Sequence, residues 1–255
     1  MRKFLVSSFL TMFSAIVLFG CLGGSSVPPL NFSEYTKIAI APFATEEESV
    51  MMSDALPYDM GTQLNLKFKK EGKIDWIYYQ SEAIQPVRDK LTELQISPEE
   101  IYQDPARAKK VGESLGTDLI IVGNVSNPRI EKKDDHTPYY DMSQQAGISG
   151  TTRYTLLIQS STIDISLKAI DVKTGSVVWN VEGMKGYIKY IKAFQSGVPS
   201  RDEVSEEVIK ADIRKHLARR ILHALSPEGF SDKDVPEILL KPSLNLMRGG
   251  KQVIW

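Results

Sequence analysis

An unbroken apolar block near the middle of the chain is the clearest pattern in the sequence. Residues 119–122 read Leu-Ile-Ile-Val and lie within the run 116–125. Gly116 precedes this apolar block and Gly123 follows it. A block this short and rich in β-branched residues is typical of a strand that is covered on both faces. We therefore expect it in the middle of a sheet, with helices packed over both sides.

Two further strand patterns precede the block, and a hairpin pattern follows it. Residues 37–43 alternate isoleucine with alanine before Pro42, and residues 74–79 form a shorter, more aromatic strand. Residues 155–170 and 176–182 each alternate apolar with polar side chains. The segment between them, Asp-Val-Lys-Thr-Gly, has glycine where a turn needs a positive φ. This pattern predicts a β-hairpin on the C-terminal side of the buried strand.

Helical periodicity fills the spaces between the strands. Met60, Leu64 and Phe68 recur on one face of a predicted helix. Ser97 opens a capping box next to a proline, and Asp104 also precedes a proline, so each is a helix start signal. The first predicted helix runs from near residue 50 or near Pro57 to residue 70. The others cover residues 81–94, 105–115 and 201–225, with a short one that begins at residue 98.

The last predicted helix begins after a second capping box, at residues 200–203. Its apolar stripe consists of Val204, Val208, Ile213, Leu217, Ile221 and Leu225. We expect His216 and His223 on its surface, because no further metal-ligand set accompanies them.

This order of elements favours an α/β (α+β) fold, with a mixed β-sheet and helices on both faces. It predicts a single α/β domain over residues 35–225. Residues 128–153 are polar and contain glycine, so we expect a long loop there, either a solvated excursion or a functional segment. Residues 226–255 contain three prolines. They are expected to form an irregular C-terminal tail, whose apolar end docks either on its own domain or on a partner.

The N-terminus has the pattern of a targeting segment. Arg2 and Lys3 precede an almost wholly apolar stretch at residues 4–19, which is shorter than the roughly 20 residues of a spanning helix. The Leu-Phe-Gly-Cys that ends at Cys21 resembles the lipobox of bacterial lipoproteins. The resemblance implies a lipoprotein signal peptide over residues 1–20, cleavage before Cys21, and attachment of lipid, palmitate included, to that cysteine.

The residues after the lipobox bear on the location of the protein. Leu22 stands where an aspartate would direct retention, which implies sorting to the outer membrane of a Gram-negative cell. The alternative is an uncleaved membrane anchor with an incidental cysteine. Residues 21–34 contain Gly-Gly-Ser-Ser and two consecutive prolines, which indicate a short flexible tether. Its roughly ten linker residues span about 35 Å at most, so the domain is expected close to the membrane on its periplasmic face.

Composition and motifs exclude several function classes. The formal net charge is −1 and no long basic stripe occurs, which argues against nucleic-acid binding. The sequence has no P-loop, no Gly-x-Gly-x-x-Gly, no nucleophile elbow and no metal-binding histidine set. The acidic pairs at 134–135 and 206–207 are expected to be solvated. We therefore expect no catalytic residue, no cofactor and no metal site.

Three segments in order carry a resemblance to a known family. Residues 37–43 are similar to its opening strand ending in Pro-Phe, and residues 116–125 to its Gly-(small)-Asp-(apolar)-Gly strand. Residues 171–179 are similar to its Asp-x-x-Thr-Gly-x-x-x-Trp hairpin. The chain thereby resembles the periplasmic α/β domain shared by the curli-secretion protein CsgG, the peptidoglycan-synthase activator lipoprotein LpoB and the N-terminal domain of TolB. The resemblance implies no catalytic residues, because these relatives bind and assemble.

The sequence therefore favours a non-catalytic interaction module for a cell-envelope complex of secretion, pilus, flagellar or wall-synthesis machinery. A CsgG-like pore is disfavoured, because residues 128–153 are too charged and residues 184–199 too few for membrane hairpins. A synthase activator like LpoB is an alternative, although the short tether argues against a reach across the periplasm. A periplasmic enzyme or small-ligand-binding protein is a further alternative. Envelope proteins are the expected partners, and a homo-oligomer is left open. The candidate contacts are five aromatic residues: Tyr139, Tyr140, Tyr187, Tyr190 and Phe194.

Overall fold

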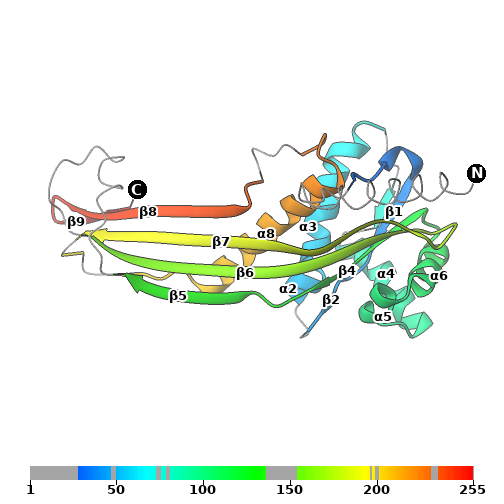
Figure 1. Ribbon diagram of the computed structural model, residues 1–255, viewed down its shortest axis with the longest axis horizontal. Coiled ribbons are helices and arrows are strands. Elements are labelled where there is room, and N and C mark those ends of the chain that lie inside the picture. The colour runs from blue at the N-terminus through cyan, green and yellow to red at the C-terminus, as the bar shows by residue number, and fades with distance from the viewer. Residues whose placement is uncertain are drawn as a thin grey trace, which may run out of the picture.

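A single mixed sheet runs along the long axis of the computed structural model (Figure 1). The structure describes residues 28–46, 50–72, 76–78, 81–135, 154–195, 197–198, 201–230 and 235–254. Its strands are β1 (Lys37–Ile40), β2 (Ala44–Thr45), β3 (Trp76–Tyr78), β4 (Leu119–Val125), β5 (Arg129–Asp135), β6 (Tyr154–Asp171), β7 (Val177–Gln195), β8 (Ile238–Arg248) and β9 (Lys251–Ile254). Their order in the sheet is β3-β1-β4-β6-β7-β8-β9, with β2 beside β4 and β5 beside β6.

The helices gather at one end of this sheet, except for α8, which continues along the sheet (Figure 1). They are η1 (Phe32–Glu34), α2 (Val50–Ser53), α3 (Ala55–Leu64), the π-helical η2 (Asn65–Lys69), α4 (Ser81–Leu94), α5 (Pro98–Gln103), α6 (Pro105–Leu115) and α8 (Glu206–Leu225). The predicted start signals at Ser97 and Asp104 are confirmed, since Ser97 forms the capping box with Glu100 and Asp104 caps α6. Among the described residues, no helix has both the length and the apolar character that a bilayer crossing requires.

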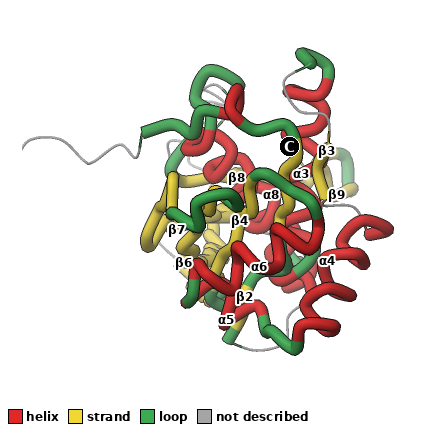
Figure 2. Tube along the Cα trace, turned by 90° about the vertical axis from the view of Figure 1, so that its right-hand side faces the viewer, coloured by secondary structure: helices red, strands yellow, loops and turns green. Residues whose placement is uncertain are grey.

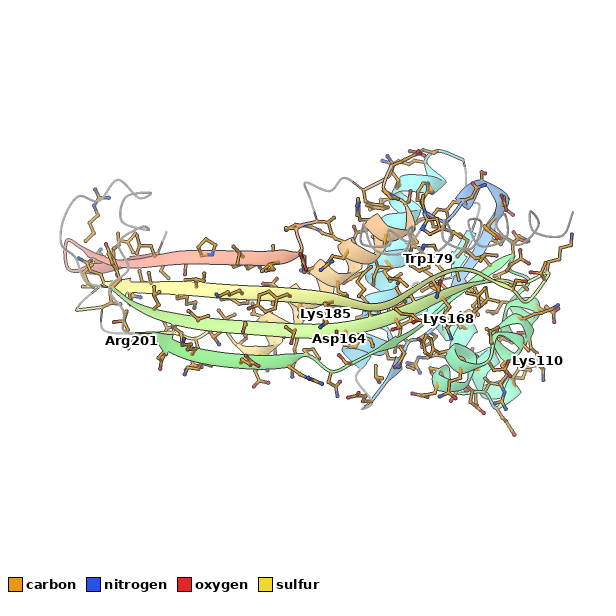
Figure 3. The ribbon with its side chains drawn as sticks, viewed as in Figure 1. Lys110, Asp164, Lys168, Trp179, Lys185 and Arg201 are labelled. Carbon is orange, nitrogen blue, oxygen red and sulfur yellow. The ribbon has the colours of Figure 1, made fainter. Side chains whose placement is uncertain are left out.

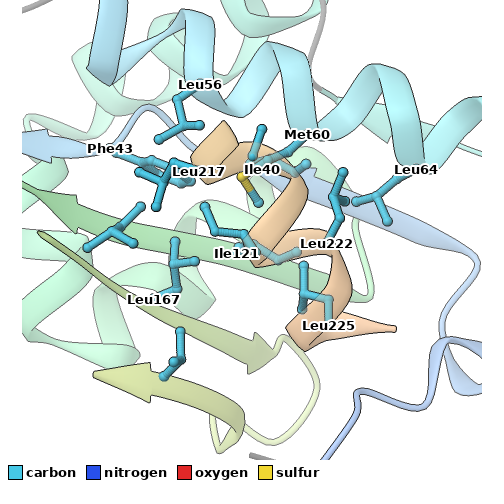
Figure 4. Close-up of a cluster of buried hydrophobic side chains, with 14 of the residues drawn as sticks. Ile40, Phe43, Leu56, Met60, Leu64, Ile121, Leu167, Leu217, Leu222 and Leu225 are labelled. Carbon is cyan, nitrogen blue, oxygen red and sulfur yellow. The ribbon is translucent and has the colours of Figure 1, made fainter. Parts of the chain in front are cut away.

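The predicted central strand, β4, is confirmed as the middle of the packed region. It pairs in parallel with β1 on one side and antiparallel with β6 on the other. Leu119, Ile120, Ile121 and Val122 all have 0% exposed surface. Leu119 and Ile121 pack with α3 and α8 on one face (Figure 4), whereas Ile120 and Val122 pack with α4, α5 and α6 on the other. The mixed sheet with helices on both faces is therefore confirmed, and Figure 2 shows it from the end.

The sheet extends beyond β4 as an arm (Figure 1). β4 pairs with β6 only from Ile165 to Asp171, and the remainder of β6 pairs with β5 and β7. β8 runs parallel to β7 from position 187 to position 194, and β9 turns back against the end of β8. The arm consists of β5, β8, β9 and the parts of β6 and β7 that lie beyond β4. We name the remainder of the molecule the core half.

Helix α8 connects the two regions by lying across one face of both. Its side chains Ile213, Leu217 and Ile221 join the main core, which also contains Ile188 of the arm. A Cβ at Gly186 of β7 would lie 2.8 Å from Ile163 Cγ2 and 3.4 Å from Leu217 Cδ1. The glycine therefore permits the close approach of α8 to the arm. We name the face beneath α8 the inner face of the arm, and the opposite face the outer face.

Three sequence predictions about this part of the chain are wrong. The expected loop at 128–153 begins with strand β5, and residues 136–153 lie outside the described residues. The expected irregular tail at 226–255 contains strands β8 and β9. The last helix begins at Glu206 with Ser205 as its cap, not after residues 200–203. The first two errors share a cause, because strands that lie at or near a sheet edge need fewer apolar residues than buried ones.

Candidate functional site

The outer face of the arm carries an apolar patch with no described helix over it (Figure 1). In the parallel pair β7–β8, Tyr187 lies beside Ile238, and Ile191 lies beside Pro242. Side chains alternate between faces along a strand, so Leu240 falls on the same face as these four. Ile238 and Leu240 are 44% and 56% exposed. We name Tyr187, Ile191, Ile238, Leu240 and Pro242 the outer patch.

Basic side chains border the outer patch. Lys189 lies beside Leu240 in the register of β7 and β8. Lys185 is opposite Asp164 across β6 and β7, and both are seen on the arm in Figure 3. Lys168 marks where the helical cover of this face begins, because its Nζ donates to the backbone oxygen of Tyr102 in α5 at 3.0 Å. An apolar strip with this border is suited to a partner whose apolar surface is rimmed by carboxylates.

Two of the predicted contact residues are on the wrong face for this role. Tyr190 and Phe194 are 6% and 3% exposed on the inner face, so the expectation that they are exposed contacts is incorrect. Tyr187, three residues before Tyr190, is partly buried on the outer face. Strand alternation separates them, because β7 extends to Gln195, well beyond the strand predicted at residues 176–182. Tyr139, Tyr140 and Cys21 lie outside the described residues.

On the inner face, Tyr190 belongs to a network that joins three elements. Its hydroxyl donates to Asp212 Oδ2 in α8, and Lys241 Nζ of β8 pairs with the same carboxylate oxygen. Burial and the adjacent carboxylate raise the pKa of Tyr190, so the phenol stays protonated and donates. Burial acts to raise the pKa of Asp212, but hydrogen bonds from Lys241 and Tyr190 hold it below its ordinary value. The network fastens β8 to the rest of the arm.

Two other polar contacts hold the connections of α8 in place. Gln159 of β6 is buried and makes two bonds to the backbone of Val204, one to its oxygen at 3.0 Å and one from its nitrogen at 2.8 Å. His216 is 3% exposed and its Nε2 lies 3.4 Å from the backbone oxygen of Glu237, so the prediction that it is a surface residue is wrong. Burial lowers the pKa of His216. These groups stabilise the fold and show no opening to solvent for chemistry.

The polar residues of the segments that carry the resemblance also serve the fold. Asp118 accepts bonds from Thr36 N, Thr36 Oγ1 and Lys37 N at 2.9–3.1 Å, which joins the starts of β1 and β4. Asp171 Oδ1 accepts from the nitrogen and hydroxyl of Thr174 at 2.6 and 2.7 Å, which closes the hairpin turn. Gly175 has the predicted positive φ, at 78°. These segments therefore mark an architecture and not a site.

A pocket lies where the N-terminal segment meets η2 and the residues that follow α8. Its volume is about 330 Å³, and its lining includes Asn31, Lys67 and Glu71. The two charged groups pair with each other at 3.3 Å. Within the described ranges, no three His, Cys, Asp or Glu side chains gather as a metal site would require. That the protein is not an enzyme stays a prediction.

Sequence reasoning missed Ile238 and Leu240, although a signal was available. The even positions of residues 238–246 are Ile, Leu, Pro, Leu and Leu, which is the period of a strand with one apolar face. Pro242 conceals this pattern because proline argues against a central strand, yet it is tolerated in a strand at or near an edge. β8 is such a strand, since β9 covers only its last four residues, 245–248.

Comparison with known proteins gives a fold likeness without a family. No family model and no curated protein matches the chain. Similar solved structures include the PelC dodecamer from Paraburkholderia phytofirmans, at 14% identity and a TM-score of 0.34, covering 79% of this chain and 93% of that one. The lipoprotein GNA1162 from Neisseria meningitidis has 11% identity and a TM-score of 0.31, covering 73% and 97%. A putative neuraminyllactose-binding hemagglutinin homolog from Helicobacter pylori has 13% identity and a TM-score of 0.33, covering 85% and 95%. Scores this low carry no argument about function.

Proposed function

We propose that this chain is a lipid-anchored protein of the bacterial envelope that docks a partner protein on the outer patch of its arm. The anchor is the lipid on Cys21, at the periplasmic face of the outer membrane. The protein has no catalysis of its own and serves the assembly of an envelope complex, such as secretion, pilus, flagellar or wall-synthesis machinery. Activation of a peptidoglycan synthase is the alternative within the same class.

The observation that carries the proposal is the exposure of Ile238 and Leu240 on a sheet face that is closely packed elsewhere. In the core half, α4, α5 and α6 bury that side of the sheet, including Ile120 and Val122 at 0% exposure. In the arm the same side presents large apolar side chains at 44% and 56% exposure. Apolar side chains clustered on an exposed face are typical of a protein–protein interaction site.

The position of the tether also favours the arm as the docking region. Leu30 is fastened to the end of α8, with its backbone nitrogen 2.9 Å from the oxygen of Leu225. In Figure 1 this first described segment lies at the core half, and the arm points the other way. A tether that enters at the core half leaves the arm, with the outer patch on its side, clear of the anchored end. The patch is therefore available to a component that approaches from the periplasm.

A matched pair of variants tests the docking role. Leu240→Asp places a charge in the outer patch, and Val208→Asp places one on α8, at a side chain that is 47% exposed. Both sites are solvent-accessible, so both variants should fold with melting temperatures near that of the parent. A photo-reactive residue at position 187 should cross-link one discrete protein in intact cells, and Leu240→Asp alone should abolish that cross-link. Equal cross-linking in the two variants would refute the outer patch as the docking site.

The anchor is tested in the same cells. Cys21→Ser should lose incorporation of labelled palmitate and leave the membrane fraction, while the folded domain persists. Retention of label would contradict lipidation at that residue. Because the cross-link at position 187 is measured separately, a failure of the anchor and a failure of the docking surface can be distinguished.

A further inference from the structure

Strand β5 forms an open edge of the arm. It pairs with β6 along all seven of its residues, and no described strand pairs with its other side. Arg129, Glu131, Lys132, Lys133 and Asp134 are all exposed. An open edge of this kind offers unpaired backbone N–H and C=O groups to another strand.

The charges of β5 have an order that suits a second copy of the same strand. The sequence is Arg-Ile-Glu-Lys-Lys-Asp-Asp, with Lys132 at its centre. In an antiparallel pair of two such strands centred on Lys132, Glu131 of each copy stands opposite Lys133 of the other. Arg129 stands opposite position 135, an aspartate. Each pairing occurs twice because of the two-fold axis, so every odd position meets an opposite charge.

The same order of charges disfavours the two neighbouring antiparallel registers. Two strands related by a two-fold axis perpendicular to the sheet keep their outer faces on the same side, so a residue that points outward can only stand opposite another that points outward. Alternative registers of this kind therefore shift the opposing strand by two positions. One step in one direction places Glu131 opposite Glu131, and one step in the other places Lys133 opposite Lys133. Parallel self-pairing in register would also place like charges side by side. A parallel pair shifted by two positions has complementary charges, but it has no two-fold axis and does not form a closed dimer. Charged edges normally discourage pairing, but the order of charges on this one suits its own copy in the register centred on Lys132.

The residue on the two-fold axis has its charge compensated. Lys132 would face Lys132 of the second copy, on the inner side of the sheet. In each chain Lys132 Nζ already forms an ion pair with Glu203, which comes from the segment before α8. The two lysines therefore approach as two ion pairs and not as two bare cations.

We propose that two copies of this chain associate through β5, antiparallel and centred on Lys132, to form one continuous sheet across both arms. The axis perpendicular to the sheet places both outer faces on the same side. The two outer patches then belong to one extended surface, with α8 of each copy on the opposite side. The association does not depend on which partner the outer patch binds.

Cysteine cross-linking in membranes tests the register of the full chain. Opposite residues of an antiparallel pair have Cα atoms roughly 4.5–5.5 Å apart, within the range of a disulfide. Lys132→Cys should give a disulfide-linked dimer on mild oxidation. Asp134→Cys is the matched control on the same face, because it lies four positions from its symmetry mate, about 13 Å along the strand. The proposal would be overturned if the Asp134→Cys variant cross-links as strongly as the Lys132→Cys variant, or if the Lys132→Cys variant does not cross-link.

Charge reversal tests the complementarity and guards against a folding artefact. In the Lys132→Cys chain, adding Glu131→Lys places like charges together twice and should reduce the dimer band by about tenfold or more. Adding Lys133→Glu to that variant restores opposite charges and should restore the band. The pairing would be overturned if Glu131→Lys did not reduce the dimer band. It would also be overturned if the variant with both Glu131→Lys and Lys133→Glu stayed monomeric while its circular dichroism matched the parent. In either case the cross-link from position 187 to a partner protein is unaffected, which separates this result from the proposed function.

Discussion

The core half and the arm share one sheet but differ in how its two faces are covered. In the core half, helices lie on both faces, and β4 is apolar at four consecutive positions, 119–122. In the arm, α8 covers the inner face alone, and β6 alternates buried and partly exposed residues over most of its length. The core half is therefore specified by burial on both faces, whereas the arm leaves Ile238 and Leu240 exposed on its outer face. Farther along the same face a second cluster is buried, which consists of Tyr154, Leu156, Ala193 and Leu244.

We expect the largest difference in stability between the two regions when an apolar side chain is truncated to alanine in each. Ile121→Ala removes a fully buried side chain from β4 and should lower the free energy of unfolding by about 2–5 kcal/mol. Leu240→Ala removes a side chain that is 56% exposed and should change it by less than about 0.5 kcal/mol. Urea unfolding followed by circular dichroism measures both. Similar losses would show that the outer patch is part of the core.

A smaller effect is expected where α8 joins the two regions. Gly186→Ala introduces a Cβ that would lie 2.8 Å from Ile163 Cγ2, so α8 or β6 must shift. Overpacking of this kind should lower the free energy of unfolding by about 1–3 kcal/mol. Lys185→Ala, at the neighbouring exposed position, is the control and should be close to neutral. If both variants unfold like the parent, α8 is not closely packed on the arm.

The smallest effect is expected at the network that fastens β8. Tyr190→Phe removes one hydrogen bond to the Asp212 carboxylate and should lower the free energy of unfolding at neutral pH by about 1 kcal/mol. Hydrogen bonds hold the pKa of Asp212 down in the folded state, so their stabilisation is present above the unfolded value of about 3.9. It is lost as the pH falls through the lower pKa of the folded state.

The difference between parent and Tyr190→Phe should therefore be constant from pH 7 to about pH 4 and shrink in more acidic solution. Urea titrations at a series of pH values measure it. A difference that grows below pH 4 would contradict the direction of the pKa shift at Asp212.

Local signals were sufficient for much of the core half. Ser97 and Asp104 were identified as helix starts because their caps act within three residues, and Gly175 because a turn demands its φ. His216 was misplaced, since its burial depends on the strand that follows β7 across the sheet and not on its own helix. Tyr190 was misplaced for the same reason, because its burial depends on the position of α8, to which its hydroxyl is bonded through Asp212.

Consecutive residues alone were enough to specify the buried strand β4, the hairpin turn and the capped helices. Periodicity and capping act over a few residues, so they can be recognised without the fold. That β5 and β8 extend the sheet into an arm, and that Ile238 and Leu240 stay exposed on its outer face, became visible only in three dimensions. Strand pairing and burial join residues far apart in the chain, such as Tyr187 and Ile238, so the alternation within β8 does not show which strand lies beside it.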